Sequence, residues 1–162
     1  MRKYLPKLFL TLMLMVLSTG LWAQQDPLIG TWKQNIGKGK STNPTPAANP
    51  TTSYTIKYEP YGKDGSKVTG DQVTQQRTNH ITYACEYDGK DCPLTGDPAR
   101  DTTAMTRVDR YTTVRTNKKE GKVVDIQVRV VSRDGKSMTT TTMTPDAQGQ
   151  VTNAGLSFFD KQ

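Results

Sequence analysis

Residues that could act as acids, bases or nucleophiles are few in this chain. It has one histidine, His80, and nucleophilic catalysis needs such a base within hydrogen-bond reach of the attacking group. The segment 155–158 (GLSF) lacks the second glycine of a nucleophile elbow. The three glutamates, Glu59, Glu86 and Glu120, fall on expected outer strand faces or in a turn, so glycoside hydrolysis by paired carboxylates finds no support. The sequence therefore predicts a protein that is not an enzyme, with no catalytic residue and no cofactor.

Carboxylates that could bind a metal ion are more numerous, and they are the aspartates Asp88, Asp91, Asp97 and Asp101. Carboxylates gathered on loops can bind calcium, but this spacing does not match an EF-hand loop. Asp88 precedes a glycine and Asp97 precedes a proline, and both positions are typical of turns. We therefore expect turn residues here and no metal site.

The two cysteines, Cys85 and Cys92, enclose the pair Asp88-Gly89, which is a strong signal for a tight hairpin turn. Counting outward from a two-residue turn places Cys85 opposite Cys92. In an exported chain an even pair favours a disulfide, and two free buried thiols are the alternative. A bulge at Gly89 would shift the register and break the pairing.

Basic residues dominate the segment 100–136, which holds ten of them against five acidic residues. On an alternating strand, Arg129 points outward if the valines on either side point inward. We expect Arg107, Arg115 and Arg129 on a cationic surface that could contact an anionic envelope polymer, and the alternative is a solvated face that keeps the protein soluble. Tyr111 is the only aromatic residue of the segment, which speaks against a nucleic-acid partner.

The elements that must position these residues are short strands, because apolar and polar residues alternate along them and glycine-containing turns separate them. The predicted strands are 30–36, 53–59, 66–69, 80–87, 90–94, 102–108, 111–118, 122–132, 137–144 and 151–159. An open sheet of that many strands would leave exposed edges, which closure into a barrel removes. The predicted fold is all-β, an antiparallel up-and-down meander of 8–10 strands closed into a barrel. A β-sandwich is the alternative.

A barrel of about eight strands can enclose one small ligand. The apolar and aromatic residues expected to face inward are Trp32, Tyr54, Ile56, Tyr58, Ile81, Tyr83, Val124, Ile126 and Val128. These residues would line a site for a small apolar or amphipathic molecule, or they would fill the core of a chain that has few apolar groups.

The first 23 residues predict a signal peptide. Basic residues precede an apolar run at 8–17, and the small Ala23 suits cleavage by a signal peptidase. The apolar run is shorter than the roughly 20 residues needed to span a bilayer, so we expect no membrane span after cleavage. No cysteine lies at the cleavage point, so a lipoprotein is not expected.

The exported part is expected to be one secreted or periplasmic domain, residues 24–162, in which residues 37–52 form an irregular loop rich in proline, asparagine and threonine. Cleavage removes three basic residues and no acidic one, so the net charge falls from +7 to +4. The sequence gives no indication of the oligomeric state.

The segment Ile29-Gly30-Thr31-Trp32 resembles the Gly-x-Trp opening of lipocalin-like barrels. In that family the tryptophan packs across the closed end of the barrel, and an arginine on a late strand covers it. No arginine follows Arg133 in this chain, which leaves Lys136 or Lys161 for that place.

The chain also resembles a group of uncharacterised secreted bacterial proteins through the motifs GTWKQN, YDGKDCPLTGDP, GKVV, SRDGKS and FDKQ, which recur in order. The group usually lacks the Cys85–Cys92 pair. This resemblance implies a small exported β-rich domain and brings no activity, ligand or catalytic residue with it.

Two functions fit these features. The first is an exported barrel that binds a small apolar or amphipathic ligand. The alternative is a non-enzymatic structural or interaction protein of the envelope, with a filled barrel and a basic face. An internal cavity would favour the first function, because typical ligand pockets have volumes of about 300 Å3 or more.

Overall fold

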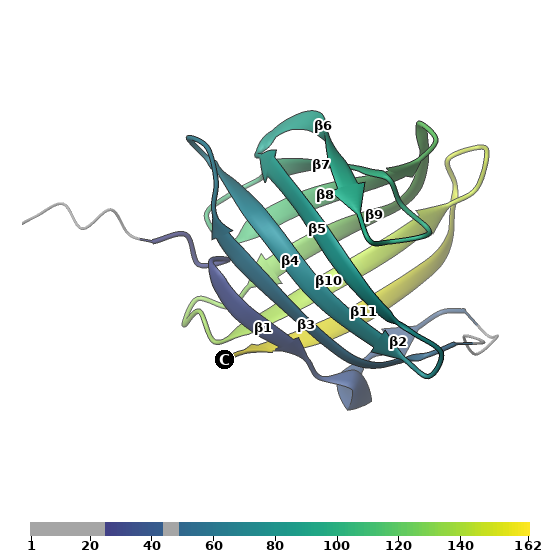
Figure 1. The fold of residues 1–162 in the computed structure, drawn as a ribbon, viewed down its shortest axis with the longest axis horizontal. Helices are drawn as coiled ribbons and strands as arrows, with labels where there is room; N and C mark the ends of the chain where they lie inside the picture. Colours follow the sequence, from purple (N-terminus) through teal and green to yellow (C-terminus); the bar gives the residue numbers. More distant parts are fainter. Residues whose placement is uncertain (1–24, 44–48) are drawn as a thin grey trace, which may run out of the picture.

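The computed structural model describes residues 25–43 and 49–162 (Figure 1). The predicted signal peptide, residues 1–23, lies outside the described residues. The strands and the short 3-10 helix η1 are β1 (Gly30–Gln34), η1 (Ile36–Lys38), β2 (Lys40–Ser41), β3 (Thr51–Pro60), β4 (Gly65–Thr74), β5 (Thr78–Glu86), β6 (Asp88–Thr95), β7 (Thr102–Arg107), β8 (Thr112–Lys119), β9 (Lys122–Val131), β10 (Ser137–Pro145) and β11 (Val151–Lys161). Within the described ranges, no helix has the length and apolar character needed to cross a membrane.

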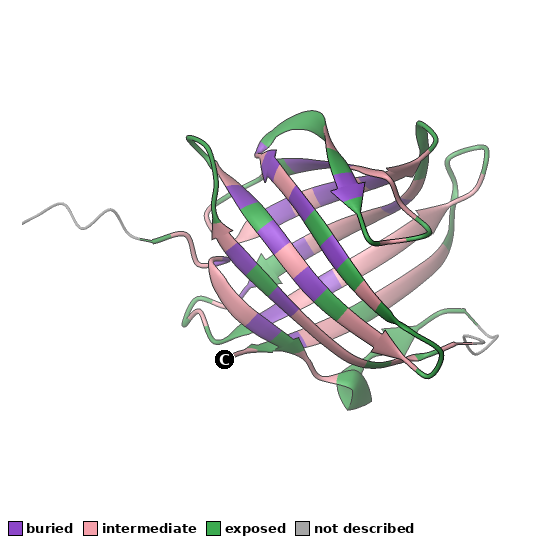
Figure 2. Cartoon of the chain, viewed as in Figure 1, coloured by how far each residue is buried: buried purple, intermediate pink, exposed green. Residues whose placement is uncertain are grey.

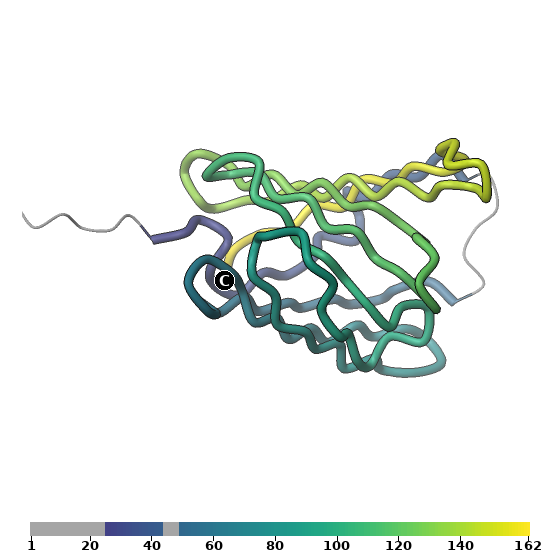
Figure 3. Tube along the Cα trace, turned by 90° about the horizontal axis from the view of Figure 1, so that it is seen from above, coloured from purple at the N-terminus to yellow at the C-terminus, as the bar shows by residue number. Residues whose placement is uncertain are grey.

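Hydrogen bonds from β1 to both β3 and β11 close the sheet into a barrel. From β3 to β11, each strand pairs antiparallel with the next one along the chain. Seen from above, the barrel is flattened, with β3–β5 facing β8–β11 (Figure 3). The predicted antiparallel up-and-down barrel is therefore confirmed, and it has ten strands.

Each predicted strand has a counterpart that differs by a few residues at its ends. The sequence does not predict β2, which lies in the segment expected to be irregular and pairs with β11 at Gly155 and Leu156. Between β8 and β9, Glu120 and Gly121 have φ values of 52° and 76°. Two successive positive φ values are what a type I′ hairpin turn requires, and this turn pairs Lys119 with Lys122 and Lys118 with Val123. A bulge before Lys118 then shifts the register by one residue, so that Asn117 pairs with Asp125.

Trp32 is fully buried, and in the β1–β11 pair it lies opposite Lys161, next to the C-terminus. Its indole Nε1 donates a hydrogen bond of 2.8 Å to the backbone oxygen of Leu28. The ammonium of Lys161 lies 5.0 Å from the centre of the indole ring and donates to the backbone oxygen of Pro27 at 3.2 Å. Lys161, one of the two lysines expected for this place, therefore covers the tryptophan.

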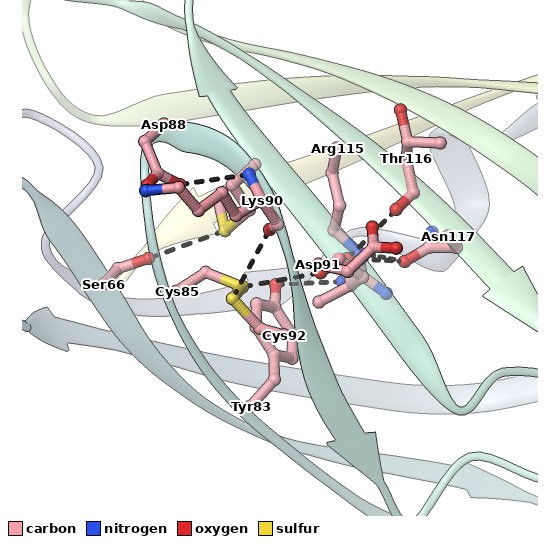
Figure 4. The surroundings of a disulfide bond; sticks show 12 residues. Ser66, Tyr83, Cys85, Asp88, Lys90, Asp91, Cys92, Arg115, Thr116 and Asn117 are labelled. Carbon is pink, nitrogen blue, oxygen red and sulfur yellow. Dashed lines mark hydrogen bonds and ion pairs between the residues drawn. A yellow bond between two sulfur atoms is a disulfide. The ribbon is translucent and has the colours of Figure 1, made fainter. Parts of the chain in front are cut away.

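Cys85 and Cys92 form the predicted disulfide, with their Cα atoms 5.8 Å apart (Figure 4). The pairs formed farther along β5 and β6 continue in register to this bridge. The expected two-residue turn is wrong, however. Only Gly89 of the Asp88-Gly89 pair has a positive φ, 77°, and Asp88 already pairs with β7. A disulfide is compatible with an oxidising compartment.

Buried and exposed residues alternate along the strands, most clearly on β3, β4 and β5 (Figure 2). On β9 the alternation has the opposite phase to the one predicted from sequence. Asp125 and Arg129 are only 4% and 3% exposed, whereas Val130 is 45% exposed. Because successive side chains point to opposite faces of a strand, the valine-rich face of β9 is the outer face. The inward placement of Val124, Ile126 and Val128 is therefore wrong.

The physical reason is that the polar face of β9 finds hydrogen-bond partners inside the barrel. Asn117 of β8 lies directly opposite Asp125, and its Nδ2 donates to Asp125 Oδ1 at 2.6 Å. Burial of a polar group is costly only where the group lacks a partner. A bulge in the β8–β9 pair next to Asn117 produces this pairing, and the polar faces of both strands point inward together.

Candidate functional site: the interior cavity

The barrel interior contains a cavity of about 200 Å3 that is partly open to solvent. Side chains of β1, β3, β4, β5, β8, β9, β10 and β11 line it, together with one residue of the loop before β7. Ile56, Ile81, Met138 and Phe159 form its apolar wall. The ring of Tyr54 meets the ring of Phe159 edge-on, with the ring centres 6.0 Å apart. Strands from both layers of the barrel therefore contribute to the cavity.

Four of the nine residues predicted to line a ligand site do line the cavity: Tyr54, Ile56, Tyr58 and Ile81. Trp32 and Tyr83 are buried in the adjoining core. Arg115 and Arg129, which the sequence predicts on a cationic surface, also line the cavity and are each only 3% exposed. That surface prediction is wrong for both arginines, because they belong to the inward faces of β8 and β9.

Arg115 is held by neutral groups. Its Nε donates to Asn117 Oδ1 at 2.5 Å, and its Nη1 donates to the hydroxyl of Tyr83 at 2.9 Å (Figure 4). The guanidinium carbon lies 4.7 Å from the centre of the Tyr83 ring. No carboxylate among the described residues forms an ion pair with Arg115. Its charge is instead stabilised by the ring and hydroxyl of Tyr83 and by the side-chain amide of Asn117.

Arg129 has fewer partners still. Its Nη2 donates to Gln127 Oε1 at 2.6 Å, while its Nη1 is buried without a hydrogen-bond partner in the described part of the chain. The guanidinium carbon lies 5.9 Å from the centre of the Tyr58 ring. The hydroxyls of Tyr58 and Thr140, which also line the cavity, are likewise buried and without a partner.

The two carboxylates beside this part of the core, Asp97 and Asp125, form ion pairs with a third arginine, Arg100. Nε of Arg100 lies 2.6 Å from Asp125 Oδ2, and Nη1 of Arg100 lies 2.6 Å from Asp97 Oδ2. The remaining oxygen of Asp125 accepts the hydrogen bond from Asn117. Asp97 and Asp125 carry two negative charges against the one positive charge of Arg100, so they offset part of the positive charge of Arg115 and Arg129, although no described carboxylate pairs with either arginine.

The pKa values of the buried tyrosines reflect this positive charge. Burial raises the pKa of Tyr83, but the charges of Arg115 and Arg129 outweigh burial and hold the pKa below its ordinary value. The Tyr58 hydroxyl also lowers the pKa of Tyr83, but by less than the two arginines do. This hydroxyl forms no well-aligned hydrogen bond in the described chain. Burial keeps the pKa of Tyr58 itself well above its ordinary value, against the opposing effect of Arg129. Arg115 and Arg129 therefore place positive charge next to the Tyr83 hydroxyl.

Arg107, the third arginine predicted on a cationic surface, is engaged within the chain. Its Nη2 lies 2.6 Å from Asp26 Oδ2, and its guanidinium carbon lies 4.1 Å from the centre of the Tyr87 ring. The ion pair links the N-terminal segment, which contains Asp26, to β7, which contains Arg107. Contact between Arg107 and an anionic polymer stays a prediction.

The residues considered for metal binding or catalysis lie apart from the cavity or have other partners. Within the described ranges, no three His, Cys, Asp or Glu side chains gather as a metal site would require. Asp88 contacts Lys90, and Asp91 contacts Lys118. Asp97 contacts Arg100, and Asp101 accepts a hydrogen bond from the backbone nitrogen of Glu120. His80 is exposed, and its Nδ1 lies 2.7 Å from Asp71 Oδ1.

The fold and the site together define a class: a closed antiparallel ten-stranded barrel with a cavity lined by polar, basic and apolar side chains. Comparison of the chain with models of protein families finds no match, and neither does comparison with curated protein sequences. The function therefore has to be argued from the cavity itself.

Proposed function

We propose that this barrel binds a small molecule in its interior cavity. The observation that carries the proposal is a set of three buried polar atoms on the cavity wall without a hydrogen-bond partner: Tyr58 Oη, Arg129 Nη1 and Thr140 Oγ1. Buried polar atoms in folded proteins are nearly always paired. A ligand that supplies acceptor atoms would satisfy all three, and it would displace water from the apolar wall at the same time.

The volume of the cavity limits the ligand to a small molecule. Pockets for drug-sized ligands have about 300–1,000 Å3, and this cavity has about 200 Å3. One water molecule takes about 30 Å3 of the liquid, so the space corresponds to about seven waters. The ligand is therefore small, and it is amphipathic because both polar and apolar side chains line the cavity.

The alternative is a structural or interaction protein of the envelope with a filled barrel and a basic face. A cavity lined by unpartnered donors supports ligand binding over a filled barrel. The basic face also loses Arg115 and Arg129, which are buried. We further propose that the protein acts outside the cytoplasm after removal of a signal peptide, as the composition of residues 1–23 and the resemblance to secreted proteins suggest.

Native mass spectrometry of the purified protein, after incubation with an envelope extract, tests this proposal. Thr142 lines the cavity and Thr141 is its neighbour on the outer face of β10, so Thr142→Phe fills the cavity and Thr141→Phe is the matched control. We expect a small-molecule adduct on the wild type and on Thr141→Phe, but not on Thr142→Phe. A wild-type protein without any adduct, or an adduct that persists in Thr142→Phe, would overturn the proposal.

A further inference from the structure

The first step concerns the charge of Arg129. Its side chain is 3% exposed, its only hydrogen-bond partner is the neutral Gln127, and its Nη1 has none in the described chain. Arginine stays protonated inside proteins. A buried charge without a counter-charge is costly, and an anion bound in the cavity would remove much of that cost.

The second step concerns the hydroxyls around Arg129. Thr140 lies directly opposite Arg129 on β10, and the Tyr58 ring of β3 lies across the cavity, 5.9 Å from the guanidinium carbon. Both hydroxyls are buried without a well-aligned hydrogen bond in the described chain, although the Tyr58 hydroxyl lies near enough to Tyr83 to lower its pKa. With Nη1 of Arg129, three such donors belong to residues that line one cavity. A carboxylate has two oxygens with about four acceptor positions, which is enough to accept all three hydrogen bonds.

The third step concerns Arg115, which is the diagonal neighbour of Arg129 on the inward face of the β8–β9 pair, since Arg115 lies opposite Gln127 and Thr113 lies opposite Arg129. Two of its nitrogens, Nε and Nη1, are engaged by neutral partners, and no hydrogen bond of Nη2 occurs within the described ranges. A second positive charge therefore lies beside the three donors, which favours an anion over a neutral polar group.

The apolar wall decides which anion fits. Ile56, Ile81 and Phe159 line the same cavity as the arginines. A phosphate ion presents oxygen atoms in all directions, so some would face these side chains without a hydrogen bond, which is unfavourable. An organic acid has a charged end and an apolar end, and both ends are satisfied by this arrangement.

We propose that the ligand of this cavity is a small organic acid, bound as its carboxylate. Arg129, Tyr58 and Thr140 donate hydrogen bonds to the carboxylate. Arg115 supplies the second positive charge, and the apolar body of the acid packs against Ile56, Ile81 and Phe159. This inference rests on the proposed function and adds the chemical class of the ligand.

Isothermal titration calorimetry with benzoate and hexanoate, at pH 7 and with the disulfide formed, tests the inference. Benzamide and hexanamide are the uncharged probes of the same shape, and inorganic phosphate tests for general anion binding. The variants are Arg129→Met and Thr140→Val, with Arg133→Met as the control because Arg133 is exposed on the surface. Arg129→Met replaces the charge by an apolar chain of similar length, and Thr140→Val removes only the hydroxyl.

We expect at least one of the two acids to bind the wild type and Arg133→Met equally, and at least about tenfold more tightly than its amide. The affinity should fall by about tenfold or more in Arg129→Met, the effect of losing one hydrogen bond to a charged group, and by a smaller factor in Thr140→Val. Amides that bind as tightly as the acids, phosphate that binds more tightly, or unchanged affinity in Arg129→Met would each overturn the carboxylate assignment and leave the proposed function standing. If no probe binds and the mass spectra show no adduct, both proposals fail.

Discussion

The guanidinium of Arg115 lies over the ring of Tyr83, 4.7 Å from its centre, and also donates a 2.9 Å hydrogen bond to the Tyr83 hydroxyl (Figure 4). The two side chains come from opposite layers of the barrel, β8 and β5. Both are almost fully buried, at 3% and 2% exposure. One buried charge is thus held by one aromatic side chain, through both its face and its polar tip.

The substitution Tyr83→Phe tests this relationship. It keeps the ring but removes the hydroxyl that accepts from Arg115 Nη1, and hydrogen bonds to charged groups contribute about 1.5–3 kcal/mol. We expect the free energy of unfolding to fall by about that amount in urea titrations. Tyr61→Phe is the control, since Tyr61 is 45% exposed and surface substitutions change stability by about 0.5 kcal/mol or less. Equal stability of the two variants would show that the hydroxyl does not support Arg115.

The buried tyrosines predict a loss of stability at high pH. Burial raises the pKa of Tyr87 to about 12, whereas a tyrosine of the unfolded chain titrates near 10. The unfolded state therefore releases its proton first, so the contribution of Tyr87 is complete below pH 10 and is lost as the pH rises from about 10 to 12. The slope is at most about 1.4 kcal/mol per pH unit for one group.

Unfolding experiments between pH 9 and 12 measure that slope in the wild type and in Tyr87→Phe. Burial also raises the pKa values of Tyr54 and Tyr58, so some decline remains in the variant. The lowered pKa of Tyr83 acts in the opposite direction in both proteins, so it cancels in the comparison. We expect a shallower decline in Tyr87→Phe, and parallel curves would contradict the assignment.

Removal of the disulfide should weaken the protein without unfolding it. Cys85 and Cys92 are separated by seven positions, and closing so short a loop stabilises by about 2.5 kcal/mol on the chain-entropy account. We expect the double variant Cys85→Ala/Cys92→Ala to lose about that much stability while keeping its far-ultraviolet circular dichroism spectrum. Reductant should lower the stability of the wild type to a similar extent and leave the variant unchanged. A variant without β structure would show that the bridge is required for folding.

Gly30 is predicted to tolerate no side chain. Its φ is 132°, and a Cβ atom there would lie 2.6 Å from Cε of Lys161, the residue that covers Trp32. Strained backbone of this kind costs about 1–3 kcal/mol. Gly30→Ala should therefore lower the melting temperature, whereas Gly37→Ala should not, because a Cβ at Gly37 meets only one atom, 3.9 Å away. If Gly30→Ala/Lys161→Ala regains all of the lost stability, the clash and not the backbone angle is the cause.

The strands and their order could be predicted because period-two alternation and glycine turns are local features of the sequence. The Cys85–Cys92 bridge followed from the same counting, even though Asp88 does not sit in the turn. Closure of the barrel followed from the number of strands. None of these predictions depends on which face of a strand is buried.

The candidate site could be predicted only in part, because the inward face of β9 cannot be chosen from β9 alone. Valine and isoleucine alternate with aspartate, glutamine and arginine, and either set can face the interior if its polar members find partners. Counting from the Glu120-Gly121 turn alone would pair Asn117 with Val124, but a bulge next to Asn117 shifts the pairing by one residue to Asp125. This bulge groups the complementary polar residues of the two strands on one face, and the turn residues do not predict it. The inward placement of Tyr54 and Ile56 on β3 could be predicted, because the opposite face of that strand carries the charged Lys57 and Glu59.

The orientation of β9 gives the last prediction. Val130 is 45% exposed on the outer face, and the adjacent Val131 is 3% exposed inside the barrel opposite Met138. Val130→Lys should change the free energy of unfolding by about 0.5 kcal/mol or less. Val131→Lys places an unpaired charge in the core, on the same face of β9 as the buried Arg129, and should cost about 3–5 kcal/mol. Urea unfolding of the two variants measures the difference. The reverse order, with Val130→Lys the more damaging, would restore the face that the valine pattern alone predicts and would remove Arg129 from the cavity.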